Sequence, residues 1–255
     1  MRVISLNVWL GFAYDKLERF LKDQKATTDV FCFQEVLMEP RTASPASVKI
    51  MEKHGGAEPV YDLYQRLQKA LPGFTGVPSE PYSDAGTRLA MFFREAQGAP
   101  AYSEAQVLDA LASHDVLGTG MSQSQSVRLQ CMRFPGGIVV ANTHGASIWG
   151  VYGDCLERAV QSRRILSLLG MIPGRKLLLG DLNLRPGMEG IRILESEMRN
   201  LVNGSGATTT RSSLTAKETR GIITDYAFAS PELAVKKFRV LPDEASDHLP
   251  LLVEC

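Results

Sequence analysis

Several apolar, strand-like runs in this chain end directly in a carboxylate or carboxamide side chain. The polar residues that close three of these runs are Asn7, Gln34, Glu35, Asp181 and Asn183. Their side chains offer hard oxygen atoms, which are the ligands that small divalent cations prefer. If the runs form strands of shared sheets, their ends can converge on one site. The pattern therefore favours a fold that gathers strand ends.

The second half of the chain repeats this form. One strand-like run ends at His144, and residues 221–224 run into Asp225, which predicts another strand end. Towards the C-terminal end, Asp247 and His248 stand directly before the last apolar run. An Asp-His pair alone could belong to a turn, because Ser and Asp form local hydrogen bonds there. It gains significance from the other polar strand ends.

Six short motifs lie on these strand ends in a fixed order. They are Leu6-Asn7, Gln34-Glu35, Thr143-His144, Gly180-Asp181-Leu182-Asn183, Thr224-Asp225-Tyr226 and Ser246-Asp247-His248. With this order and spacing, the chain resembles the endonuclease/exonuclease/phosphatase superfamily, which has the deoxyribonuclease I-like fold. One such motif is unspecific, whereas the whole ordered set is a specific pattern. The resemblance covers essentially the whole chain, from Arg2 to Val253.

The resemblance implies a four-layer α/β/β/α sandwich, in which two mixed β-sheets pack face to face between helices. The residues also favour this α/β (α+β) class, because the regular β–α alternation of a doubly wound parallel sheet is missing. The spacing of apolar residues predicts helices over residues 14–24, 58–71, 154–169 and 188–198. Short apolar runs predict strands over residues 74–77, 89–94, 127–134 and 138–141.

A length of 255 residues suits one large domain or two small ones. Because the motifs reach from one end of the chain to the other, we expect a single catalytic domain over residues 1–255. Residues 39–57 contain Pro40, Pro45 and the pair Gly55-Gly56, which predict a loop-rich insertion. Residues 203–220 are rich in Gly, Ser and Thr and predict a long polar loop, a kind of segment that often carries function.

The composition, with 44% hydrophobic and 22% charged residues, is that of a soluble globular protein. Lys and Arg together number 28, and Asp and Glu together also number 28. The chain therefore lacks the strong basic signature that is typical of nucleic-acid binding, although nucleic acid stays a possible partner. The chain has neither a run of roughly 18 apolar residues nor a signal peptide, so we expect a cytoplasmic protein without a membrane span. The four cysteines lack the C-x-x-C spacing of zinc or dithiol sites.

The resemblance implies hydrolysis of a phosphoester, which needs a water aimed in line and neutralisation of charge on the phosphate oxygens. Mg²⁺, or Mn²⁺ in its place, supplies that charge while binding few protein carboxylates. We expect Glu35, Asp247 and Asn7 to form the metal site, in which Glu35 and Asp247 bind the ion and Asn7 holds a metal-bound water or a carboxylate. Asp181 is expected to orient or deprotonate the attacking water, and Asn183 to contact a phosphate oxygen.

Asp225 and His248 are expected to form a dyad, in which the carboxylate fixes the imidazole tautomer and leaves the second ring nitrogen for the phosphate. The sequence does not decide whether Asp181 or His248 activates the water. By the same resemblance, His144 stabilises the phosphate or protonates a leaving group. A histidine at this position disfavours an abasic-site repair role, because that branch of the superfamily typically lacks it.

Three further residues are candidates for contact with the substrate. Arg185 and Arg211 could each clamp a phosphate through paired hydrogen bonds. Trp9 stands where many nucleolytic members have an Asp, which disfavours a second metal ligand there. Its ring could stack on a base or contact a sugar or lipid, although core packing is an equal alternative.

These expectations describe a divalent-metal-dependent phosphoester hydrolase of the phosphodiesterase or nuclease type. The alternative is a phosphatase or phosphodiesterase for a lipid, inositol or other small phosphate ester. A catalytically silent binding protein of the same fold is a third hypothesis, which the complete motif set disfavours. The sequence leaves open the substrate, endo or exo preference, the number of metal ions and the oligomeric state.

Overall fold

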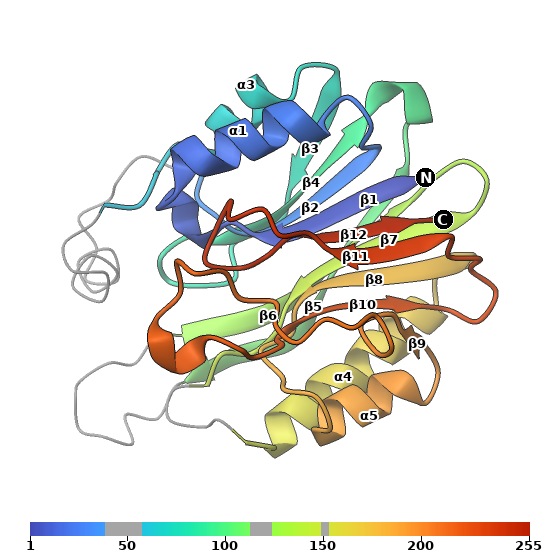
Figure 1. Ribbon diagram of the computed structural model, residues 1–255. Helices are drawn as coiled ribbons and strands as arrows, with labels where there is room; N and C mark the ends of the chain where they lie inside the picture. The colour runs from blue at the N-terminus through green and yellow to red at the C-terminus, as the bar shows by residue number, and fades with distance from the viewer. Residues whose placement is uncertain (39–57, 113–123, 149–152) are drawn as a thin grey trace.

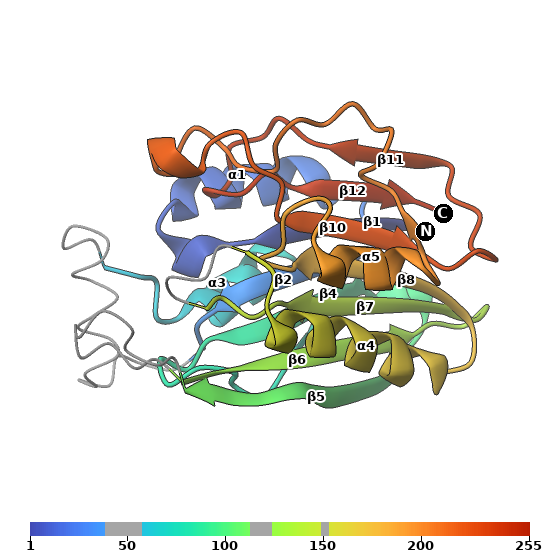
Figure 2. The same cartoon turned by 90° about the horizontal axis from the view of Figure 1, so that it is seen from below.

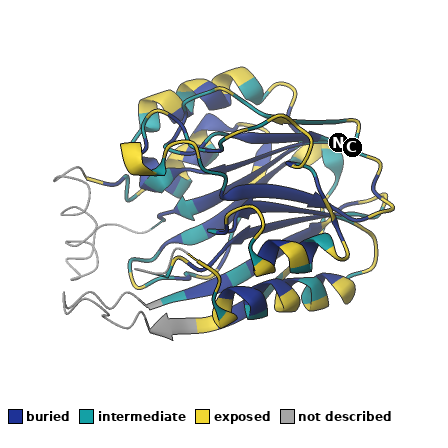
Figure 3. Ribbon diagram, turned by 60° about the horizontal axis from the view of Figure 1, so that its bottom comes forward, coloured by how far each residue is buried: buried dark blue, intermediate teal, exposed yellow. Residues whose placement is uncertain are grey.

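A computed structural model describes residues 1–38, 58–112, 124–148 and 153–255. Within them, two six-stranded β-sheets pack face to face, and helices cover the outer face of each sheet (Figure 1). This arrangement confirms the predicted four-layer α/β/β/α sandwich. Buried strands form the middle layers, and the helices carry exposed residues on their outer sides (Figure 3). The insertion predicted at residues 39–57 lies outside the described residues.

The first sheet joins both ends of the chain. Its strands, in spatial order, are β11 (Lys237–Val240), β12 (Leu251–Glu254), β1 (Arg2–Asn7), β2 (Val30–Val36), β4 (Arg88–Arg94) and β3 (Phe74–Pro78). Only β1 and β2 are parallel neighbours in this sheet. Helices α1 (Tyr14–Gln24) and α3 (Leu63–Ala70) cover its outer face, where Leu17 and Leu67 share a core with Phe31.

The second sheet comes from the middle of the chain. Its strands, in spatial order, are β5 (Ala101–Ala112), β6 (Ser124–Arg133), β7 (Ile138–His144), β8 (Arg175–Asp181), β10 (Asp225–Ala229) and β9 (Arg199–Asn200). Only β7 and β8 are parallel here. Helices α4 (Leu156–Gly170) and α5 (Glu189–Glu195) lie along its outer face (Figure 2), with Ile165 and Leu194 packed in one core with Phe228.

Both faces of the central strands are buried, which is why their sequences are almost continuously apolar. Side chains alternate along a strand, so Val3 and Val30 face the other sheet while Ile4 and Phe31 face the helices. The second sheet contributes Val140, Leu177 and Leu179 to the same inner layer. The polar residues at the strand ends therefore extend from a dry core, and the sheets fix their positions.

Residues 221–224 do not form the strand that the sequence predicts. β10 begins at Asp225 and runs antiparallel to β8, with Asp225 directly opposite Asp181. The segment before it pairs with the polar loop instead, because the Thr210 N–H donates to the Ile222 carbonyl at 3.0 Å. Asp225 thus starts its strand but lies at the same end of the sheet as the C-terminal ends of β7 and β8.

The other predicted elements are present with small shifts of their ends. The helix predicted over 14–24 matches α1, whereas α3 begins at Leu63 and not at residue 58, because residues 58–60 have no regular structure and a turn follows at 61–62. The sequence did not predict β5 or β11, which are edge strands with many polar residues. The 3₁₀ helices among the described residues are η1 (Trp9–Gly11), η2 (Glu95–Gln97) and η3 (Lys217–Thr219). No described helix has the length and apolar character needed to cross a membrane.

A buried polar bridge ties the two sheets together directly behind the polar strand ends. Gln34 Nε2 donates to Asn142 Oδ1 at 2.7 Å and to Ser5 Oγ at 3.1 Å, and Asn142 Nδ2 donates to the Phe33 carbonyl at 3.0 Å. All three polar side chains are buried. Such groups stabilise the fold only while each keeps its partner, because an unpaired buried polar group carries its full desolvation cost.

We expect Gln34→Ala to lower the free energy of unfolding by about 2–4 kcal/mol, because it leaves a cavity and unpaired groups on Ser5 and Asn142. Urea unfolding followed by tryptophan fluorescence measures the loss. The exposed Gln65, whose side chain donates to the Met38 carbonyl, provides the matched control Gln65→Ala, with a change below about 0.5 kcal/mol. Equal losses in the two variants would contradict a structural role for the bridge.

Candidate active site

A cavity of about 640 Å³ opens at the end of the sandwich where the polar strand ends meet. It brings together most of the predicted site residues. Those that line it are Trp9, Glu35, His144, Asp181, Asn183, Arg211, Asp247 and His248. Asn7 and Asp225 lie one layer behind, in hydrogen bonds to lining residues. Arg185 is exposed and is not among the lining residues, so the structure does not bring this predicted phosphate contact to the site.

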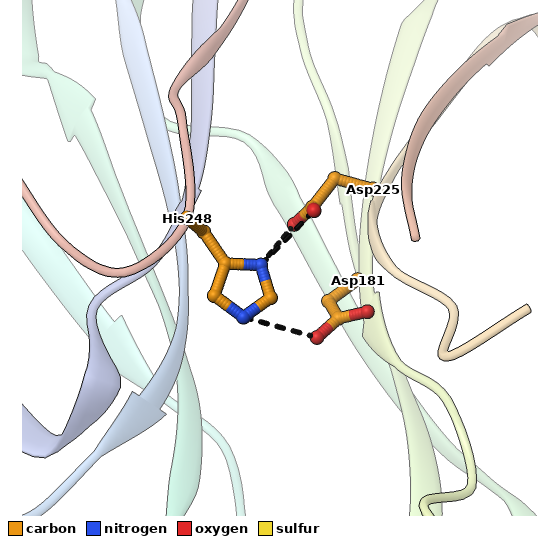
Figure 4. Close-up of side chains that lie close together, drawn as sticks. All are labelled: Asp181, Asp225 and His248. Atoms are coloured by element: carbon orange, nitrogen blue, oxygen red, sulfur yellow. Dashed lines mark hydrogen bonds and ion pairs between the residues drawn. The ribbon is translucent and has the colours of Figure 1, made fainter. Parts of the chain in front are cut away.

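Asp225, His248 and Asp181 form a chain of polar contacts across the two sheets (Figure 4). His248 Nδ1 lies 2.9 Å and 3.0 Å from the two carboxylate oxygens of Asp225. His248 Nε2 faces the other way, 3.6 Å from Asp181 Oδ2. The Thr210 hydroxyl donates to Asp225 at 2.6 Å and holds its carboxylate in place. The predicted dyad geometry is therefore present, with Nε2 directed into the cavity.

Three carboxylates and one guanidinium set the protonation of His248. Burial lowers the pKa of the imidazole, but Asp225, Asp247 and Asp181 outweigh burial and Arg211 and raise the pKa to about 9. Arg211 Nη1 lies 2.5 Å from Nε2, so the guanidinium and a proton compete for this nitrogen. When Arg211 is bonded elsewhere, the surrounding carboxylates favour the imidazolium at neutral pH.

Asp181 is the most buried of the carboxylates that line the cavity. Burial alone raises its pKa, but the charges of His248, Arg211 and His144, together with the Asn183 N–H, lower the pKa below its ordinary value. That N–H donates to Asp181 Oδ1 at 2.9 Å, which leaves Oδ2 facing the cavity residues. Asp181 is therefore ionised at neutral pH and fixed in direction.

A glycine allows Asp181 to reach this position. Gly180 has a φ of +146°, and a Cβ at this residue would lie 1.9 Å from the Thr143 carbonyl oxygen of the neighbouring strand. The close approach of β7 and β8 therefore excludes any side chain here. The same pairing sets His144 directly opposite Asp181.

Glu35 lies at an irregularity of β2. The register with β4 shifts between Phe33 and Val36, and Glu35 has a φ of +59°, a left-handed conformation that costs a non-glycine residue about 1–3 kcal/mol. The freed Glu35 N–H donates to the Tyr82 hydroxyl at 3.0 Å. This bulge takes the carboxylate out of the sheet's regular alternation and directs it into the cavity.

Asn7 links two carboxylates of the site. Its Nδ2 donates to Glu35 Oε1 at 3.1 Å and contacts Asp181 Oδ2 at 3.3 Å. Its Oδ1 accepts from the Trp9 N–H at 3.0 Å, inside the protein. In this orientation Asn7 presents its amide hydrogens to the site, which suits a residue that holds carboxylates better than a direct metal ligand.

The predicted polar loop 203–220 delivers the cation of the site. Arg211 Nη1 lies 3.4 Å from Asp247 Oδ2, and Nη2 lies 4.0 Å from Asp181 Oδ2. Burial lowers the pKa of this guanidinium, but the surrounding carboxylates outweigh burial and raise it, so Arg211 is always charged. Among the described residues that line the cavity, Arg211 is the one Lys or Arg.

The donor set fits a hard divalent cation. Glu35 and Asp247 both line the cavity with carboxylate oxygens, the ligand type that Mg²⁺ and Mn²⁺ prefer. Burial raises the pKa of Asp247, and the like charge of Glu35 raises it further against the opposing effects of His248 and Arg211. A cation between the two carboxylates would relieve this repulsion. Asp181, Asp225 and His248 also offer ligand atoms within 4.8 Å of one another, but Asp225 and His248 already bond to each other.

Two polar residues that hold predicted site residues in place were not themselves predicted from the sequence. Tyr82 bonds to Glu35 and contacts His144, and Thr210 bonds to Asp225. Neither lies in a strand-end motif, and a lone Tyr or Thr in a polar segment carries no distinguishing pattern. Only the folded arrangement shows their partners.

A comparison with the sequence profiles of protein families gives a match to the Endonuclease/Exonuclease/phosphatase family over residues 4–248. The chain belongs to the endonuclease/exonuclease/phosphatase family. The match confirms the resemblance that the strand-end motifs suggest. A comparison with curated proteins gave no match.

Solved structures of this family share the fold at low sequence identity. An endonuclease/exonuclease/phosphatase from Bacteroides vulgatus is 17% identical with a TM-score of 0.69, over 99% of this chain and 97% of that one. A mannosyl-6-phosphatase from Bacteroides thetaiotaomicron is 17% identical with a TM-score of 0.67, over 100% and 98%. The catalytic domain of human Nocturnin with bound sulfate is 19% identical with a TM-score of 0.63, over 99% and 92%.

The His248 environment predicts a pH dependence of stability in the metal-free protein. A group whose pKa is raised on folding stabilises the folded state below its unfolded pKa, near 6.5, and that contribution disappears as the pH rises through the folded value of about 9. In EDTA we expect the free energy of unfolding to fall between these pH values by on the order of 3 kcal/mol. Urea unfolding at several pH values measures the slope.

Asp225→Asn is the diagnostic variant for this slope, because it removes the carboxylate that raises the pKa of His248 most. The variant should be less stable at pH 6.5 and should show a flatter dependence up to pH 9. The same slope in the variant and in the wild type would contradict the assigned protonation of His248.

Proposed function

We propose that this protein is a divalent-metal-dependent phosphoester hydrolase in which an activated water attacks phosphorus in line. One observation carries the proposal: a single cavity joins two metal-capable carboxylates, an ionised and oriented Asp181, and the Asp225–His248 dyad. These are the parts that phosphoryl transfer to water needs, namely charge neutralisation, an aligned water and donors to the phosphate oxygens.

Glu35 and Asp247 would hold Mg²⁺ or Mn²⁺. Such an ion supplies positive charge to the non-bridging oxygens of the phosphoester. Asn7 holds Glu35 and Asp181 through its amide nitrogen and keeps the two carboxylates in fixed relation. One proposed metal ligand, Glu35, and the water-orienting acid therefore share one support.

The pKa of Asp181 is lowered and that of His248 is raised, which suits the two residues to different roles. Asp181 has a lowered pKa, so it is a weak base but a constant hydrogen-bond acceptor that orients a water and takes its proton as attack proceeds. His248 has a pKa raised to about 9, so its imidazolium is a better donor to a phosphate oxygen than a base. This division supports Asp181 as the residue that handles the water.

Arg211, His144 and Asn183 complete the phosphate site. Arg211 lies between Asp181, Asp247 and His248, and an entering phosphate would receive its planar donors. His144 Nε2 lies 3.7 Å from Asp181 Oδ2 and 3.1 Å from Asn183 Nδ2, on the same wall. Departure of Arg211 from Nε2 to the phosphate would also free His248 to carry its proton.

The described lining favours a substrate with few phosphates. It contains one arginine, together with the hydroxyls of Ser83, Thr87, Thr215 and Thr219. A protein that follows a nucleic-acid backbone neutralises several phosphates with Lys and Arg. This observation supports the small phosphate ester as the substrate class, and a nuclease or phosphodiesterase of limited reach is the second candidate.

We expect turnover with Mg²⁺ or Mn²⁺ and no turnover in excess EDTA. Assays should compare p-nitrophenyl phosphate, bis-p-nitrophenyl phosphate, sugar phosphates, and single- and double-stranded DNA. Asp181→Asn should lower kcat by roughly 10²–10⁴-fold, because the amide cannot accept the proton of the attacking water. Metal-independent turnover would contradict the proposal, and substrate binding without any turnover in the wild type would instead support the silent binding protein.

Two arginines in loops provide a matched test of the phosphate site. Arg211→Ala should lower kcat/KM by roughly tenfold to a thousandfold, because it removes the cation in the cavity lining that would face the phosphate. Arg185→Ala, at an exposed position outside the lining, should stay within about twofold of the wild type. Steady-state kinetics on the best substrate measures both, and equal effects would exclude the assigned role of Arg211.

A further inference from the structure

Tyr82 is buried and belongs to no motif of the sequence, yet its hydroxyl touches two separate parts of the site. It accepts the Glu35 N–H at 3.0 Å and lies 2.9 Å from His144 Nδ1. The first contact reaches a carboxylate that would hold the metal. The second reaches an imidazole that would contact the phosphate. One oxygen atom thus joins β2 of the first sheet to β7 of the second.

The contact with Glu35 stabilises an unfavourable backbone. The bulge between Phe33 and Val36 interrupts the pairing of β2 with β4, and Glu35 itself is left-handed. Its N–H has no strand partner, and the Tyr82 hydroxyl supplies one. Without that acceptor, the bulge would leave a partly buried N–H unpaired, and Glu35 could relax towards the regular strand.

The contact with His144 fixes the direction of the ring. A hydrogen bond between the Tyr82 oxygen and Nδ1 can form with the proton on either atom, and in both cases Nε2 points into the cavity. There Nε2 lies 3.7 Å from Asp181 Oδ2 and 3.9 Å from Glu35 Oε1. The two rings meet edge to face, with centroids 5.4 Å apart, which restricts rotation of the imidazole.

The backbone of Tyr82 is itself anchored on both sides. Its N–H donates to the Thr87 carbonyl at 2.9 Å, and its carbonyl accepts the Ser126 N–H at 2.7 Å. Burial, the largest cause, raises the pKa of the phenol well above its ordinary value, so the hydroxyl keeps its proton at every pH of an assay. The hydroxyl is thus a neutral and fixed hydrogen-bonding group.

We propose that Tyr82 is a positioning residue that sets the metal-holding carboxylate of Glu35 and the phosphate-facing nitrogen of His144 at once. This inference rests on the proposed function for its catalytic consequence. It also has a consequence that needs no turnover, because the position of Glu35 governs how tightly the cavity binds a divalent cation. A residue that only fills the core would affect stability and neither of these properties.

Tyr82→Phe is the test, since it removes one oxygen atom and keeps the ring. Titration calorimetry with Mn²⁺ should show roughly tenfold to hundredfold weaker binding, as expected when a group that orients a metal ligand is lost. kcat on the best substrate should fall by about the same factor. Replacement of Tyr82 by p-aminophenylalanine keeps the ring and a donor for His144 Nδ1, but its amino nitrogen is a poor acceptor for the Glu35 N–H, so Mn²⁺ binding should stay weak while part of kcat at saturating Mn²⁺ returns.

Tyr102→Phe is the matched control, because it removes a tyrosine hydroxyl that donates to Glu104 on an edge strand away from the cavity. It should bind Mn²⁺ and turn over substrate as the wild type does.

The combination of Tyr82→Phe with His144→Ala tests whether Tyr82 acts through His144. If Tyr82 acts through this ring, the double variant loses less kcat than the product of the single losses.

The outcomes separate this inference from the proposed function. Wild-type protein that binds Mn²⁺ but hydrolyses no phosphoester would defeat the proposed function, and the Mn²⁺ affinity of Tyr82→Phe would still decide the role of Tyr82. Wild-type Mn²⁺ affinity in a folded Tyr82→Phe variant would overturn the inference, whatever happens to its melting temperature. Failure of Tyr82→Phe to fold would shift the decision to the p-aminophenylalanine protein, in which wild-type Mn²⁺ affinity would overturn the inference.

Discussion

Like charges in a confined space shape the whole functional end of this molecule. The carboxylates of Glu35, Asp181, Asp225 and Asp247 all act on the guanidinium of Arg211 and hold it charged. At distances of about 4 Å, unit charges near a protein surface interact by several kcal/mol, so the cluster needs positive charge to persist. Arg211 supplies part of it, and His248 adds a further positive charge when Arg211 is bonded elsewhere. A divalent cation bound by Glu35 and Asp247 would supply the rest.

The two sheets make this crowding possible, because they hold each group from behind. The bridge of Gln34, Asn142 and Ser5 joins the sheets under the site, and Gly180 lets β7 and β8 come close enough to set His144 opposite Asp181. Asn7 and Tyr82 then link neighbouring site residues through single hydrogen bonds. Rigid support of this kind fixes the groups in advance of substrate binding, which is the main source of electrostatic catalysis.

Much of this could be predicted from the sequence, because continuous apolar runs reveal doubly buried strands and polar residues mark their ends. That pattern predicts the convergence of Glu35, Asp181 and His248, whereas the four-layer fold is implied by the family that the motifs resemble. Other features depend on tertiary contacts alone. Asp225 begins its strand because residues before it pair with the polar loop, and Arg211 enters the cavity while Arg185 stays exposed, although both are loop arginines. The edge strand β5 is held by pairing with β6 and not by its own polar sequence.

The central claim is that the cavity holds a divalent cation on Glu35 and Asp247 while Asp181 and His248 face the substrate. Crystals grown with Mn²⁺ and measured at its absorption edge test this directly, because anomalous scattering locates the metal without assumptions about chemistry. The account predicts a peak within bonding distance, about 2.0–2.3 Å, of carboxylate oxygens of Glu35 and Asp247. No peak in the cavity at millimolar Mn²⁺, or a peak bound only by Asp225 and His248, would contradict it.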